Sequence, residues 1–201
     1  MAKMGQRVSA GFSINLQIAL VRHGRASAGW DTAIDPDLDE IGTKQAKEVA
    51  NKLNLIFSDK SVDIVSSPLL RCRQTAEAFA KLRNLSVRVC EQVTEIPSPV
   101  GFEMHQRVDW LREAMQGTWV DLGDRYVAFR DSVVEFVKKL DNNSVVYSHF
   151  VAINAVIGAL TGDDRLVIRS LDNCSITLLE RDLAGNLRIA QSGHEANTLI
   201  R

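Results

Sequence analysis

Three apolar segments of this chain end in polar residues that are capable of chemistry. Two arginines and two histidines follow these segments directly or within a few residues: Arg22, His23, Arg71 and His149. A hydrophobic core has no use for an unpaired cation at such a place, because burying a charge without a partner is costly. An anion is the natural partner, so these residues predict an anion-binding site.

Two guanidinium groups that converge on one point favour a dianion as the ligand. Arginine is always charged, and its planar fork matches two phosphate oxygens at a time. Phosphate monoesters are the commonest dianions of this kind in metabolism, and their hydrolysis requires strong stabilisation of the transferring phosphoryl group. Arg22 and Arg71 are therefore predicted to bind phosphate.

Phosphate-ester hydrolysis needs either a metal-activated water or a covalent intermediate. The sequence contains no HxxEH motif, no His-Asp pair and no close cluster of carboxylates, so we expect neither a metal nor another cofactor. A neutral histidine is a competent nucleophile, and neighbouring arginine charges favour its neutral form. His23 is the candidate nucleophile, and His149 would help to hold the phosphoryl oxygens.

Short apolar strands and amphipathic helices alternate along the chain. Helices are expected where apolar residues recur at i, i+3, i+4 and i+7, as after Asp39, which is a candidate N-cap. Such alternation predicts an α/β fold with a sheet covered on both faces. Ligands of open α/β sheets bind beyond the carboxyl ends of the strands, so the polar residues are expected to meet at one edge.

Three stretches of the sequence together resemble the signature segments of the histidine phosphatase superfamily, the phosphoglycerate mutase-like family. They are "LVRHG", "SSPLLRCRQTAEAF" and "VVYSHFVAINAV", and the resemblance extends over roughly residues 16–193. It implies a three-layer α/β/α sandwich with a central, mostly parallel sheet and a small helical insertion near the site. It also implies that no metal or organic cofactor is used.

The resemblance assigns roles to individual residues. His23 matches the histidine that becomes phosphorylated, Arg22 and Arg71 match the phosphate-binding arginines, and His149 matches the second histidine. A proton donor is expected in the loop after the third strand, where Glu95 lies. Glu91 is the alternative, but it lies where that strand should end.

The chain departs from the family pattern at several positions. Gly29 and Trp30 occupy the region of a motif asparagine, Phe150 replaces a glycine that commonly follows the second histidine, and a G-x-W-E-G segment is lacking after Glu95. These departures fall where the substrate should be bound, so the sequence does not identify the substrate. We expect Ser67 to serve as a turn or helix-cap residue, and His105 and His194 to have structural roles.

The expected function is that of a metal-independent phosphatase, a phosphoric monoester hydrolase that acts on a small phosphorylated substrate through phospho-His23. Three alternatives remain open: a phosphoglycerate-mutase-type phosphotransferase, a phosphoprotein phosphatase, and a catalytically inactive phosphate-binding protein. Retention of both arginines, both histidines and a candidate acid argues against the last alternative.

Composition and charge limit the cellular context. With 201 residues and 45% hydrophobic residues, the chain is expected to form one domain over 16–201, with an insertion at about 96–124 and a loose N-terminal tail over 1–15. The net charge of -1 argues against nucleic-acid and membrane partners. Three widely spaced cysteines without a CxxC pair favour the cytoplasm. The oligomeric state, including a homodimer, is left open.

Overall fold

The structure is a computed structural model, and it describes residues 16–29 and 33–195. The tail expected at 1–15 and the residue Trp30 lie outside the described part. Six strands form one sheet: β1 (Leu16–Arg22), β2 (Asp63–Ser66), β3 (Val87–Val89), β4 (Ser144–Ser148), β5 (Ile176–Arg181) and β6 (Leu187–Gln191). The helices are α1 (Glu40–Ile56), α2 (Leu70–Arg83), the 3-10 helix η1 (Glu91–Val93), α3 (Met104–Ala114), α4 (Trp119–Leu122), α5 (Asp124–Lys138) and α6 (Phe150–Thr161).

The sheet is mixed, with a parallel part that carries the predicted site residues. Its strand order is β3-β2-β4-β1-β5-β6. The neighbours β3, β2, β4 and β1 run parallel, whereas β5 pairs antiparallel with both β1 and β6. The prediction of a mostly parallel central sheet is confirmed. Because β2, β4 and β1 are neighbours, their carboxyl ends meet at one edge.

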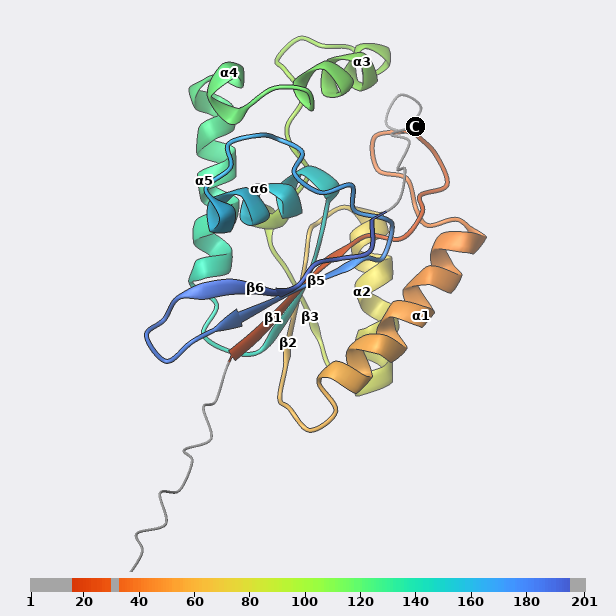
Figure 1. Cartoon of the computed structure of the whole chain (residues 1–201). Coiled ribbons are helices and arrows are strands. Elements are labelled where there is room, and N and C mark those ends of the chain that lie inside the picture. Colours follow the sequence, from red (N-terminus) through yellow and green to blue (C-terminus); the bar gives the residue numbers. More distant parts are fainter. Residues whose placement is uncertain (1–15, 30–32, 196–201) are drawn as a thin grey trace, which may run out of the picture.

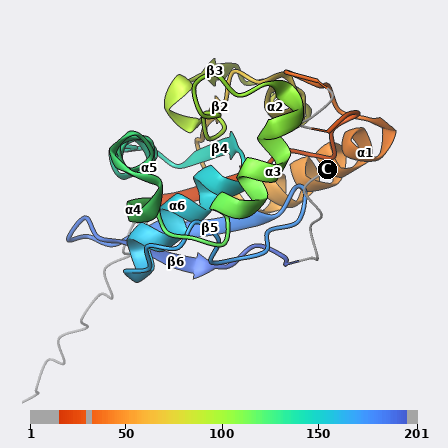
Figure 2. The same cartoon turned by 90° about the horizontal axis from the view of Figure 1, so that it is seen from above.

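Helices cover both faces of the sheet and complete three layers. Helices α1 and α2 pack on one face, and α5 and α6 on the other (Figures 1 and 2). Each face has its own hydrophobic cluster, which contains Leu53 and Phe79 on the first face and Val137 and Ile153 on the second. The α/β fold class with helices on both faces is therefore confirmed.

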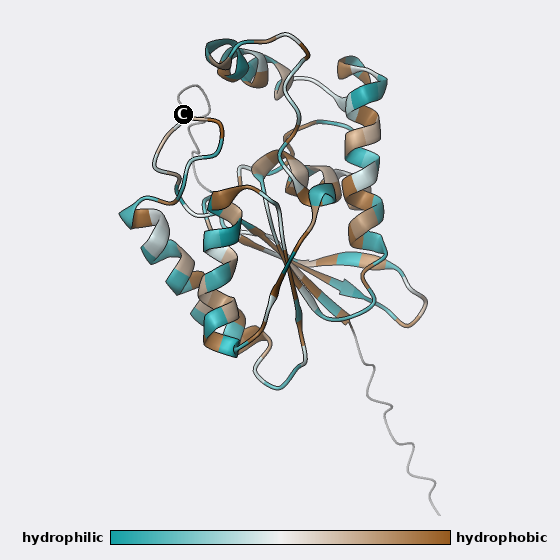
Figure 3. Ribbon diagram, turned by 180° about the vertical axis from the view of Figure 1, so that it is seen from behind, coloured by the Kyte–Doolittle hydropathy of each residue, from teal (hydrophilic) through white to brown (hydrophobic). Residues whose placement is uncertain are grey.

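The amphipathic pattern explains which side of each helix is buried. The helices carry both hydrophilic and hydrophobic residues (Figure 3). In α1 the buried residues include Ala46, Val49, Ala50 and Leu53, which have the i, i+3, i+4 and i+7 spacing expected after Asp39. Asp39 is the N-cap of α1, as predicted, and its side chain accepts a hydrogen bond from the Gly42 N–H. Short-range sequence signals therefore fix where this helix begins and which face it buries.

Two helices lie between η1 and α5, within the segment predicted as an insertion. Helix α3 was expected from the sequence, whereas α4 and η1 are too short for a periodic pattern to indicate them. Both α3 and α4 lie at the end of the molecule where β1 and β4 finish (Figure 1). A single domain over 16–201 remains a prediction. Within the described ranges, no helix is long and apolar enough to span a bilayer.

Candidate active site

The ends of β1, β2 and β4 are held together by backbone hydrogen bonds. Arg22 is paired in register with Ser148, and the next residue, His23, donates its N–H to the Ser148 carbonyl at 3.1 Å. The Ser67 N–H donates to the Tyr147 carbonyl at 2.9 Å. The rigid sheet edge therefore fixes where the side chains of the following residues begin.

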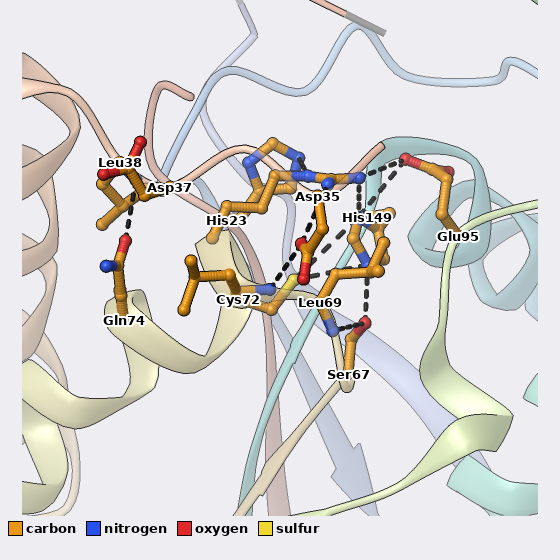
Figure 4. Close-up of polar contacts among 12 residues, drawn as sticks. His23, Asp35, Asp37, Leu38, Ser67, Leu69, Cys72, Gln74, Glu95 and His149 are labelled. Atoms are coloured by element: carbon orange, nitrogen blue, oxygen red, sulfur yellow. Dashed lines mark hydrogen bonds and ion pairs between the residues drawn. The ribbon is translucent and has the colours of Figure 1, made fainter. Parts of the chain in front are cut away.

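Arg71 lies at the centre of a cluster formed by four of the predicted residues. Figure 4 shows the side chains of the other three, His23, His149 and Glu95. Its Nε donates to His23 Nε2 at 3.2 Å, and its NH2 nitrogen lies 3.2 Å from His149 Nδ1. The same NH2 nitrogen lies 3.5 Å from Glu95 Oε2. One buried guanidinium thus contacts both histidines and the carboxylate.

The two ring nitrogens of His23 have different environments. Nδ1 lies 2.7 Å from the Gly24 carbonyl oxygen, an arrangement that requires Nδ1 to carry the proton. Nε2 is then unprotonated, and its lone pair accepts the Arg71 Nε–H. Burial, followed by the charges of Arg71, His149 and Arg22, lowers the pKa of His23 well below its usual value. His23 is therefore neutral at physiological pH, and its unprotonated Nε2 has the lone pair that a nucleophile requires.

His149 is fully buried and has a partner at each ring nitrogen. Nδ1 lies 3.2 Å from Glu95 Oε2, and Nε2 lies 2.8 Å from the Ser67 hydroxyl oxygen. If Nδ1–H donates to Glu95, then Nε2 accepts the Ser67 O–H. The Cys72 thiol donates to the Ser148 carbonyl and lies 3.4 Å from His149 Nε2; burial raises the pKa of this thiol, so it is neutral.

The Glu95 carboxylate is ionised in the free protein. Burial alone would raise the pKa of Glu95, but His149, Arg71 and the Ile96 N–H outweigh that effect and lower the pKa to about 2. Burial lowers the pKa of His149 despite the opposing influence of Glu95. The free site therefore contains an acceptor carboxylate, and protonation of Glu95 requires an additional negative charge nearby.

Among the residues that the structure describes, two guanidinium nitrogens of the candidate site are buried without a hydrogen-bond partner. They are Arg22 Nε and Arg71 NH1, and the side chains of both residues are more than nine-tenths buried. Asp35 lies 4.0 Å from Arg71 NH1, outside hydrogen-bonding distance. Buried polar groups without partners are rare in native proteins, so these N–H groups favour an anionic ligand.

His23, Glu95 and His149 also have the residue types of a metal site. Their candidate ligand atoms lie within 4.8 Å of one another. However, the Arg71 guanidinium already contacts both imidazoles and contributes a permanent positive charge. This arrangement favours an anion between these groups over a divalent cation.

Some residues considered in the sequence lie outside the cluster. Glu91 is exposed on η1, so Glu95 is the carboxylate that the structure brings to the histidines. His105 and His194 are both exposed. The expectation that their imidazoles are structural core groups is therefore wrong, because neither ring is buried.

The sequence reasoning missed two residues that support the cluster. Ser67 was expected to cap a helix or stabilise a turn; its hydroxyl accepts the Leu69 N–H at 3.3 Å but also contacts His149. Asp35 accepts the Leu70 N–H at 2.7 Å at the start of α2, one residue before Arg71. No local spacing signals either contact, because the partners are distant in sequence.

Gly24 is needed for the close packing of α1 against the loop that follows β1. A Cβ atom at Gly24 would lie 2.8 Å from the Gly42 carbonyl oxygen on α1, and one at Gly42 would lie 2.1 Å from the Arg25 carbonyl oxygen. The two glycines therefore allow α1 to approach the segment that follows His23. This close approach fixes the loop beside His23.

A hollow of about 460 Å³ lies elsewhere, between α5 and the end of α6. Its lining includes Arg130, Glu135 and Asp164, and Arg130 NH1 bonds Asp164 Oδ1 at 2.6 Å. Its charged groups thus include an internal ion pair, and none of its lining residues belongs to the cluster around Arg71.

Comparisons with known proteins show the family of the chain and relatives of the same fold. Residues 18–188 match the family model of the histidine phosphatase superfamily (branch 1). The chain is 28% identical over 196 residues to phosphoserine phosphatase 1 of Hydrogenobacter thermophilus, and the match covers 86% of this chain and 90% of that protein.

Solved structures show the same fold at lower sequence identity. A phosphoserine phosphatase from Entamoeba histolytica in complex with 3-phosphoglyceric acid has a TM-score of 0.70 and 19% identity, covering 89% of this chain and 97% of that one. A mycobacterial glucosyl-3-phosphoglycerate phosphatase complexed with VO3 has a TM-score of 0.68 and 23% identity, covering 90% of this chain and 100% of that one.

Proposed function

Since the chain belongs to the histidine phosphatase superfamily, we propose that it is a metal-independent phosphatase that hydrolyses a small phosphomonoester through a phosphohistidine on His23. The observation that carries the proposal is the position of Arg71, which contacts His23, His149 and Glu95 at once. A phosphoryl group bound to Arg71 would lie beside the unprotonated Nε2 of His23, where in-line attack is feasible.

In the first step, His23 Nε2 attacks phosphorus and the ester P–O bond breaks. The Nδ1–H bond to the Gly24 carbonyl stabilises the positive charge that develops on the imidazole. Arg22 and Arg71 hold the phosphoryl oxygens with His149. The partnerless N–H groups of both arginines support this role.

Glu95 is proposed as the proton donor to the leaving oxygen. A bound phosphate places negative charge beside the carboxylate and attracts the Arg71 and His149 groups that keep its pKa low. We therefore expect substrate binding to raise the pKa of Glu95. The substrate binds as the phosphate monoanion, and the proton that it carries passes to the Glu95 carboxylate. In the second step, the Glu95 carboxylate takes a proton from water, whose oxygen displaces His23 from phosphorus.

Phosphoserine is the first substrate to test. It is proposed because a relative matched over 86% of this chain is named phosphoserine phosphatase 1, and because the E. histolytica phosphoserine phosphatase has the same fold. Phosphoserine, 3-phosphoglycerate, sugar phosphates and phosphopeptides would be compared by release of inorganic phosphate, with and without a chelator. We expect a small phosphomonoester to be preferred, and the chelator to have no effect.

The covalent intermediate provides the decisive test. Brief reaction followed by denaturation should leave an acid-labile phosphate on the wild-type protein. His23→Ala should abolish this phosphate and reduce turnover by at least about 10³-fold. The control is His105→Ala, because His105 is exposed and lies outside the cluster. Retained turnover in His23→Ala would disprove the mechanism.

The alternatives predict different results in the same assays. Interconversion of 2- and 3-phosphoglycerate with a bisphosphate primer would indicate a mutase, and selective dephosphorylation of a phosphoprotein would indicate a phosphoprotein phosphatase. Phosphate binding without any hydrolysis would indicate a binding protein. A cytoplasmic location remains a prediction, and the oligomeric state stays open.

A further inference from the structure

Phe150 packs its aromatic ring against the Arg22 guanidinium. Phe150 is the first residue of α6 and directly follows His149. The Arg22 Cζ atom lies over the ring at 5.2 Å from its centroid, and both residues are only 8% exposed. This distance and burial are those of a cation–π interaction shielded from water.

Arg22 has few other partners. Its NH1 donates to the Leu171 carbonyl at 2.7 Å, and its Nε has no hydrogen-bond partner. Within residues 16–29 and 33–195, no carboxylate oxygen lies within the 4.0 Å ion-pair distance of the Arg22 nitrogens. The charges of Glu95 and Asp172 favour the cation from beyond that distance. Because a buried cation without a direct ion pair is costly, the ring face adds attraction at close range.

An aromatic partner has a functional advantage over a carboxylate at this place. A carboxylate would occupy the guanidinium N–H groups and would repel a phosphate. The ring instead attracts the guanidinium without accepting a conventional hydrogen bond, and Arg22 Nε has no hydrogen-bond partner, so it can donate to an anion. The side chain is thereby fixed without loss of the donors that an anion requires.

We propose that Phe150 is a positioning residue that holds Arg22 ready to bind the phosphoryl oxygens of the substrate. This inference rests on the proposed function, because it assumes that Arg22 binds phosphate. It also gives a physical role to an aromatic residue at a position where the family resemblance leads one to expect glycine. The ring would order Arg22 before the substrate arrives, which reduces the entropy cost of binding.

The test measures anion binding rather than turnover. Titration calorimetry with orthovanadate and with inorganic phosphate would compare the wild-type full chain with Phe150→Leu, Phe150→Met and Phe150→Tyr. Leucine and methionine keep an apolar side chain but remove the ring face, so we expect about five- to tenfold weaker binding. Tyrosine keeps the ring face and should bind within about twofold of wild type.

A second Arg–Phe pair, at the edge strand β3 of the sheet, serves as a control. Arg88 lies over the Phe136 ring at 5.5 Å from its centroid, on β3 and α5, away from the cluster. Phe136→Leu therefore removes a similar Arg–Phe pair and should leave anion affinity unchanged. A thermal unfolding curve for each variant separates loss of fold from loss of binding.

The Arg22→Ala background shows whether Phe150 acts through Arg22. In that background, Phe150→Leu should cause no further loss of affinity if the proposal is correct. An equal loss in both backgrounds, or unchanged affinity in the folded Phe150→Leu or Phe150→Met variant, would overturn it. If the wild-type protein binds neither anion, both this inference and the proposed function fail.

Discussion

Arg71 donates its Nε–H to the Nε2 lone pair of His23 at 3.2 Å. The residue proposed to bind the phosphate therefore also occupies, in the free protein, the nitrogen that we propose as the nucleophile. A positive charge at this distance opposes protonation of the imidazole. Substrate binding would exchange this contact for contacts between Arg71 and the phosphoryl oxygens, which frees the lone pair when phosphorus is in place.

Removal of the Arg71 charge should raise the pKa of His23. Burial is the first cause of the low pKa of His23 and Arg71 is the second, so Arg71→Ala should shift it upward but not fully to its usual value. A titration of the histidine ring by NMR measures the change directly. Arg73→Ala is the matched control, because Arg73 lies on the same helix and is exposed. Equal shifts in both variants would refute the role given to Arg71.

Glu95→Gln should have an effect that depends on the leaving group. A serine alkoxide needs a proton as it departs, so we expect kcat for phosphoserine to fall by about 10²- to 10⁴-fold. A nitrophenolate departs without a proton, so the fall for nitrophenyl phosphate should be much smaller. Steady-state kinetics with both substrates gives this comparison.

The control for the leaving-group experiment is Glu91→Gln. Glu91 is the alternative donor considered from the sequence, and it is exposed on η1. The Glu91→Gln variant should retain wild-type rates with both substrates. A leaving-group-dependent loss in Glu91→Gln, and none in Glu95→Gln, would reverse the assignment.

The low pKa of Glu95 also predicts a pH-dependent contribution to stability. A carboxyl group whose pKa is lower in the folded state stabilises the fold above its unfolded-state pKa, and this contribution is lost as pH falls through the folded-state pKa. For Glu95 that range extends from 4.5 down to about 2. The difference in unfolding free energy between wild type and Glu95→Gln should therefore shrink as pH falls through this range. Urea unfolding at several pH values tests this, and a constant difference would contradict it.

Some parts of the site could be predicted from sequence because their signals are local. Arg22, His23 and His149 follow apolar strands directly, and Asp39 precedes an amphipathic stripe at helical spacing. Glu95 was identified by resemblance, because its loop has no pattern of its own. The parallel order of β1, β2 and β4 then brings these residues together.

Other parts could not be predicted because the contacts join distant segments. The Ser67–His149 bond links residues 82 apart in sequence, and the Asp35 contact with the start of α2 links residues 35 apart. No period or spacing encodes either contact. The exposure of His105 depends on how α3 lies above the sheet, which the sequence of α3 alone does not determine.

Ser67 is expected to position His149 for catalysis. Its hydroxyl oxygen lies 2.8 Å from His149 Nε2, so donation of its O–H keeps the ring proton on Nδ1, which faces Glu95. In Ser67→Ala the ring can rotate or change tautomer, and we expect kcat to fall about tenfold with a smaller change in KM. The NMR chemical shift of His149 Nε2 should change as well, which a purely structural loss in a folded protein would not produce.

Ser66→Ala provides a closely matched control. Ser66 is as fully buried as Ser67 and also makes a side-chain hydrogen bond, but its hydroxyl donates to the Ser67 carbonyl rather than to His149. Its loss should lower stability without changing the His149 signals. If Ser66→Ala and Ser67→Ala reduce kcat equally while His149 remains unperturbed, the hydroxyl of Ser67 supports only the turn, and the tautomer of His149 is set by Glu95 alone.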